Sequence, residues 1–183
     1  MMLFRRSLAL IAALFVLAAP INLSITPQHG LELGVQQAQA QALADYAENE
    51  ATDLFLRGQA FTAPTTLYFG LSTTACSDSS VGTEVTGGSY ARVALTASLT
   101  NWSGTQSAGS TTGSSGTDGE SSNNVAITYT TPTAGWGTVT HWHVSDASTA
   151  GNILLCDDLT VSKTINSGDT VSFAIGAVTV TFQ

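Results

Sequence analysis

Residues 127–146 constrain the fold more than any other part of this sequence. β-Branched and aromatic residues recur there at every second position around the step Gly135-Trp136-Gly137, and this period is typical of β-strands. The same alternation predicts further strands at 66–72, 90–99, 153–159, 171–175 and 178–182. About seven to eight strands separated by turn residues predict an all-β fold, an antiparallel β-sandwich. The last two strands are expected to form a hairpin, and Trp136, Val139, Trp142 and Val144 to lie in the core.

The composition excludes some alternatives. Only 10% of the 183 residues are charged, which does not suit a helical bundle. The net charge is −8. Residues 43–183 hold three basic residues (five less Arg5 and Arg6) against twelve acidic ones (thirteen less Glu32). Phosphate binding needs several positioned cations, so we expect no nucleic-acid partner.

The first 42 residues differ from the rest. Arg5 and Arg6 precede the apolar run 7–20, as in a secretory signal peptide, and small residues near 38–42 could be a cleavage site. The run is too short for a membrane span, so no stable span is expected in the mature form. Residues 1–42 are therefore interpreted as a signal-peptide-like leader, with an N-terminal arm or a wrongly assigned start codon as alternatives.

An amphipathic helix is predicted at 43–58, ahead of the β-sandwich at 59–183. Gly58 is placed to end it. The apolar stripe has to be covered by the chain's own sheet or by a neighbouring subunit, and we interpret it as an assembly interface. Its members are Leu43, Tyr46, Ala47, Ala51, Leu54 and Phe55.

A polar loop rich in Ser, Thr and Gly is predicted at 101–124. Such a composition buries too little apolar surface to fold on its own, and long loops of this kind are often functional. Trp102, Asp118 and Glu120 are the candidates for an exposed binding loop, with a host glycan as a candidate ligand. A tolerated insertion is the alternative interpretation.

Few residues suggest chemistry. His141 and His143 share one face of a strand and are weak candidates for a metal site, with Asp146 or Asp158 as extra ligands. Hydrogen bonding within the sheet explains them better, because a site needs at least a third ligand. There is no Gly-x-Ser-x-Gly motif, and Asp157 and Asp158, adjacent in a strand, point to opposite faces. We therefore expect no enzyme activity, no catalytic residues and no cofactor.

The two cysteines, Cys76 and Cys156, lie far apart in the sequence. In an exported or extracellular particle they could form one disulfide. Sequence alone does not show whether their Cα atoms come close enough, so two free thiols remain the alternative.

The order of segments across residues 43–183 resembles a family of tailed-phage virion proteins, described as tail fibre, minor virion or head-decoration proteins. The matching segments are 56–58, 60–73, 87–92, 136–141, 146–147, 151–154 and 162–173. The resemblance implies a structural protein of the virion, with itself and other virion proteins as partners and no catalytic residues to carry over. The leader-like first 42 residues depart from that pattern.

The sequence therefore predicts a non-enzymatic virion protein with a tail-fibre, minor-tail or capsid-decoration role. One alternative is an exported subunit of a filament or cell surface, located in the periplasm or on the cell. A carbohydrate-binding module is the other.

Overall fold

The computed structural model describes residues 24–26, 30–32, 43–104, 114 and 119–182. The chain divides into two units, residues 1–38 and 39–183. In the first, β1 (Ser24–Thr26) pairs antiparallel with β2 (Gly30–Glu32). The apolar run 7–20 and the candidate cleavage sites lie outside the described residues. No helix in the part of the chain that the structure describes is long and apolar enough to cross a membrane.

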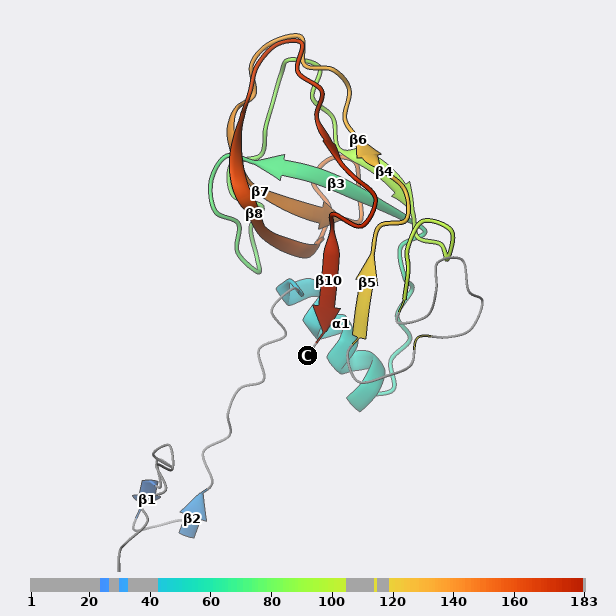
Figure 1. The fold of residues 1–183 in the computed structure, drawn as a ribbon. Coiled ribbons are helices and arrows are strands. Elements are labelled where there is room, and N and C mark those ends of the chain that lie inside the picture. The colour runs from blue at the N-terminus through green and yellow to red at the C-terminus, as the bar shows by residue number, and fades with distance from the viewer. Residues whose placement is uncertain (1–23, 27–29, 33–42, 105–113, 115–118, 183) are drawn as a thin grey trace, which may run out of the picture. The chain divides into compact units, whose positions relative to one another are not determined.

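The second unit is built on a four-stranded antiparallel sheet with the strand order β4-β3-β7-β8 (Figure 1). Its strands are β4 (Val93–Thr96), β3 (Thr66–Ser72), β7 (Gly137–Ser145) and β8 (Ile153–Ile165). Two short antiparallel pairs accompany it: β5 (Gly119–Ser122) with β10 (Thr179–Phe182), and β6 (Ile127–Thr128) with β9 (Ser172–Phe173). The all-β, antiparallel prediction is confirmed.

The core lies on one face of the four-stranded sheet. Phe69, Leu71 and Val144 are 0–2% exposed, and the register places Phe69 opposite Val144 and Leu71 opposite Trp142. Side chains of the short pairs and their flanks complete the core, namely Ile127, Tyr129, Val178 and Val180. Trp136, Val139, Trp142 and Val144 are all buried, as predicted.

Two strand predictions are wrong. The last two strands do not form a hairpin, since β9 pairs with β6 and β10 with β5. The buried Asn123 side chain separates them by donating to the Ala174 carbonyl and accepting the Val178 N–H. The predicted loop 101–124 also contains a strand at its end, because Gly119–Ser122 finds backbone partners in β10.

The helix α1 spans Asp45–Leu56. It begins after Ala44, whose N–H donates to the Leu154 carbonyl of β8 at 2.9 Å. It ends as predicted at Gly58, which has a φ of +65° that glycine adopts without strain. Asp45 and Glu48 lie in its first turn, where the helix dipole favours acidic residues.

Candidate functional site

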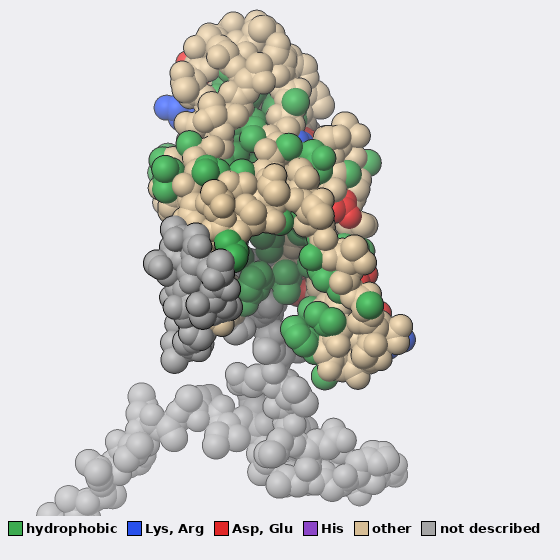
Figure 2. Space-filling model, turned by 90° about the vertical axis from the view of Figure 1, so that its right-hand side faces the viewer, with side chains coloured by type: hydrophobic (Ala, Val, Ile, Leu, Met, Phe, Trp, Pro, Cys, Tyr) green, Lys and Arg blue, Asp and Glu red, His purple; other side chains and the backbone are tan. Residues whose placement is uncertain are grey.

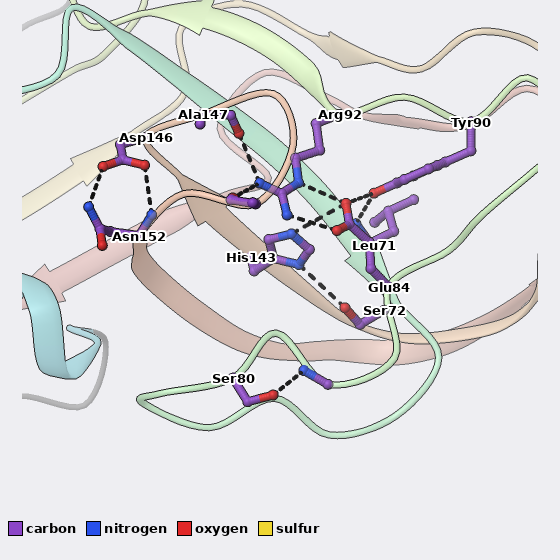
Figure 3. A network of polar contacts seen from close by, with 12 residues as sticks. Leu71, Ser72, Ser80, Glu84, Tyr90, Arg92, His143, Asp146, Ala147 and Asn152 are labelled. Carbon is purple, nitrogen blue, oxygen red and sulfur yellow. Dashed lines mark hydrogen bonds and ion pairs between the residues drawn. The ribbon is translucent and has the colours of Figure 1, made fainter.

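The most unusual cluster in the described residues is a polar network around His143 (Figure 3), a residue that alternates in β7 with the core residues Trp142 and Val144 and so lies on the opposite face of the sheet. Gly70 pairs with His143 in the register of β3 and β7, and the His143 ring lies directly over the glycine. A Cβ added to Gly70 would come within 2.2 Å of two ring atoms of His143. Glycine at this position therefore makes room for a fully buried imidazole.

Arg92 is the centre of this polar cluster. Its side chain is only 4% exposed, and its Nε and Nη2 donate to the two carboxylate oxygens of Glu84 at 2.8 Å each. Its Nη1 donates to the carbonyls of Ala147 and Ala150, again at 2.8 Å. A planar guanidinium suits this bidentate geometry. One residue thereby joins the segment after β3 to the turn between β7 and β8.

The third member of the cluster is Tyr90. Its hydroxyl donates to Glu84 Oε1 at 2.9 Å and accepts the Leu71 N–H at 2.8 Å, so it satisfies a β3 backbone group beyond the end of β4. Burial raises the pKa of Tyr90, and the neighbouring Glu84 carboxylate raises it further. The tyrosine is therefore a neutral hydrogen-bond donor over the physiological pH range.

Glu84 is held as a carboxylate. Burial alone would raise its pKa, but hydrogen bonds from Arg92 and Tyr90 and the positive charge of Arg92 outweigh burial and lower the pKa to about 2. The pair Arg92 and Glu84 is therefore ionised at any pH at which the protein would normally be handled. A partly buried, bidentate ion pair of this kind costs much to break.

Ser72, His143 and Glu84 lie in the order of a hydrolase triad. Ser72 Oγ is 3.3 Å from His143 Nδ1, and His143 Nε2 is 3.6 Å from Glu84 Oε1. Ser72 and His143 are both 0% exposed, however, and Glu84 is bound to Arg92. A substrate cannot reach the serine, and the second distance exceeds a hydrogen bond. The arrangement supports a structural role for the cluster.

The two histidines do not act together. His141 Nε2 pairs with the Asp158 carboxylate across β7 and β8, whereas His143 faces Ser72 and Glu84. Asp146 instead accepts from the backbone and side-chain nitrogens of Asn152 at 2.7 and 2.8 Å. Within the described residues, no group of three His, Cys, Asp or Glu side chains could hold a metal ion.

The candidate binding loop looks different in the structure. Trp102 is partly buried and stacks on Phe69, with ring centroids 5.7 Å apart, so the expectation of an exposed tryptophan is wrong. The Trp102 ring packs on Phe69 of the core, and the polar residues around Trp102 in the sequence give no sign of this contact. Glu120 is exposed on β5, and Asp118 lies outside the described residues.

The residues of the predicted helix interface fall into two groups. Tyr46 and Ala47 pack against the chain's own core, and Leu43 forms a β-bridge with Leu155. Leu54 and Phe55 are 43% and 78% exposed, while Ala51 is half-buried. The first half of the stripe is thus covered by the chain itself, and its end is open.

Cys76 and Cys156 are joined as a disulfide, with Cα atoms 6.3 Å apart. Cys156 lies opposite His143 in the register of β7 and β8. The bond therefore fastens the segment between β3 and β4 to β8 next to the polar cluster.

The cluster of Glu84, Tyr90 and Arg92 was not found from the sequence. Arg92 falls within the predicted strand 90–99, whereas the structure places it just before β4 with its side chain buried. One feature of the sequence does single out Arg92: residues 43–183 contain only three basic residues, so each of them is a candidate for a specific role. The segment 87–92 also belongs to the family resemblance.

A sequence model of the family described as Podophage GP4 fiber I protein gp80 matches residues 42–181. No curated protein sequence matches the chain. The family match spans both sheet edges, the Arg92 cluster and α1, but leaves out the leader-like segment. The chain belongs to this family and is a structural protein of a phage virion.

Proposed function

We propose, with membership of the fibre I family as the premise, that this protein is a non-enzymatic structural part of a phage fibre. The β-domain of residues 59–183 forms its body, and the last turn of α1 attaches that body to sister copies or to other virion proteins. The absence of a reachable nucleophile in the Ser72, His143 and Glu84 arrangement supports a structural role.

One observation carries the attachment proposal. Three successive large apolar side chains, Leu54, Phe55 and Leu56, are 43%, 78% and 81% exposed at the end of α1. Figure 2 shows hydrophobic side chains on the surface of the lower part of the domain, at the height where Figure 1 places this end of the helix. Burying one such side chain contributes about 1.5–3 kcal/mol, and exposed apolar patches mark interaction surfaces.

The test is a double variant, Leu54→Asp with Phe55→Asp, made in the phage genome. Burying two carboxylates at a contact costs more than the apolar contact contributed, so we expect the amount of this protein per purified virion to fall at least about tenfold. Quantitative mass spectrometry of purified particles measures it. Wild-type incorporation would contradict the attachment proposal.

A matched control is Ile175→Asp, which changes an apolar residue that is 68% exposed elsewhere on the domain. It should be incorporated normally. Circular dichroism of both purified variants checks that the β-domain remains folded, which the exposure of all three positions leads us to expect.

A further inference from the structure

A groove lies along the C-terminal half of β8 in the described part of the domain. It has a volume of about 580 Å³, within the range of about 300–1,000 Å³ typical of ligand pockets. Its floor includes Leu71 and Val139, which are 2% and 0% exposed. Its walls carry Leu159 and Val161 of β8 and Phe173 of β9. The groove thus opens directly onto the core.

A large bulge in β8 creates this groove. Val139 pairs with Lys163, and His141 pairs with Asp158. Between these pairs β7 has one residue, Thr140, whereas β8 has four, residues 159–162. Extra residues bend a strand away from its neighbour. Val161 is consequently 77% exposed.

The charges at the groove complement those at the end of α1. Arg57, Arg92 and Lys163 are the basic residues within 43–104 and 119–182, and among the residues of these two ranges Arg57 and Arg92 form ion pairs, whereas Lys163 forms none. Lys163 and Asp169 both line the groove. The apolar end of α1 is likewise bordered by one acid and one base, since Asp53 and Arg57 form an exposed pair at 2.8 Å.

We propose that the groove along β8 receives the last turn of α1 from a second copy of this chain. Phe55 and Leu56 enter the apolar floor and walls, Asp53 lies toward Lys163, and Arg57 lies toward Asp169. None of the residues that line the groove belongs to α1, so the helix of the same copy does not fill it. The inference rests on the proposed attachment through α1 and names its partner.

This contact joins two different surfaces of the same chain. A contact of that kind generates a ring when its rotation closes and a filament when it does not. Every copy uses one helix end and offers one groove.

A photo-crosslinking experiment on the full chain tests the contact. Unlabelled protein carries benzoylphenylalanine in place of Phe55, and it is mixed with wild-type protein labelled with ¹⁵N. After irradiation, mass spectrometry should find crosslinks from position 55 to residues 159–173 of the labelled copy. Crosslinks to the labelled α1 or to another face, or none at all, would overturn the inference.

A charge reversal gives a second readout. Lys163→Glu should weaken self-association at least about tenfold, because it places like charges together at the contact. Mixing it with an Asp53→Lys variant should restore association between the two. Sedimentation velocity measures both results, and failure of the mixture to associate would contradict the pairing.

The groove variant Val161→Asp separates this inference from the proposed function. If neither Val161→Asp nor the Leu54→Asp, Phe55→Asp helix variant is incorporated into virions, the attachment through α1 and the groove contact are both supported. If only the helix variant fails to be incorporated, α1 attaches the protein to another partner, and the groove contact is wrong. Normal incorporation of the helix variant overturns the attachment and the groove contact alike.

Discussion

The two faces of β3 and β7 are built on different physical principles. One face carries Phe69, Leu71, Trp142 and Val144, all at most 7% exposed, and aromatic stacking continues from Phe69 to Trp102 and Trp142. The other face carries Ser72 and His143, which are also buried, beneath the ion pair of Glu84 and Arg92. One layer is thus stabilised by apolar packing, and the other by hydrogen bonds and an ion pair.

This difference predicts how each face fails. An apolar layer loses stability in proportion to the volume removed, because the neighbours relax only in part. A polar layer loses stability when one partner is removed, because the other stays buried without its hydrogen bonds. On the polar face, a second substitution that removes the unpaired partner should therefore recover some of the lost stability. On the apolar face, a second substitution should bring no such recovery.

The largest effect is expected on the apolar face. Phe69→Ala removes a fully buried ring that stacks on two tryptophans and should lower the free energy of unfolding by about 4 kcal/mol. Chemical denaturation measures it. Leu99→Ala, at a side chain that is 53% exposed, is the control and should change stability by less than about 0.5 kcal/mol. Equal losses of unfolding free energy in Phe69→Ala and Leu99→Ala would contradict the assignment of Phe69 to the core.

On the polar face, Arg92→Met leaves Glu84 without its cation and two carbonyls without a donor. We expect a loss of about 3 kcal/mol in the free energy of unfolding. Adding Glu84→Gln to Arg92→Met should recover part of that loss, since the uncompensated charge is gone. Recovery of this kind has no counterpart on the apolar face.

Arg57→Met is the matched control for Arg92→Met. Its ion pair with Asp53 is exposed, with side-chain exposures of 68% and 37%, so we expect a change of less than about 0.5 kcal/mol. A loss in Arg57→Met equal to that in Arg92→Met would show that burial does not distinguish the two pairs.

The smallest of the three predicted stability losses is a pH dependence that arises from the polar face. The pKa of Glu84 is lowered from 4.5 to about 2, so its stabilisation is present above pH 4.5 and is lost as the pH falls toward 2. Allowing for its partial exposure, the loss is about 2 kcal/mol. Denaturation at a series of pH values measures it, and Glu84→Gln should flatten the curve over that interval. An unchanged slope would refute the assignment.

The strand pattern made the apolar face predictable. Alternation at 66–72 gave β3 its bounds, and the Trp136 to Val144 segment was correctly placed in the core. Hydrophobic periodicity reports which side of a strand is apolar. It does not report pairing between strands distant in sequence, which is why β9 and β10 were joined as a hairpin in error.

The polar face was hidden for a related reason. Glu84, Tyr90 and Arg92 meet His143 only through tertiary structure, and each alone has the sequence appearance of a surface residue. Trp102 is the opposite case: it is an aromatic residue with polar neighbours in the sequence, and they gave no sign of its contact with Phe69. Burial of a polar group depends on the partners that satisfy it, and those partners are not local.

The disulfide between Cys76 and Cys156 gives the body a mechanical property suited to a fibre. Once the strands have separated, force applied across residues 43 and 182 passes through the covalent link, and the chain between the two cysteines is not stretched. The bond spans a sequence separation of 80 residues, which corresponds to roughly 270 Å of fully extended chain. Reduction would release this length, and single-molecule stretching would record the domain as longer by that amount when unfolded under load.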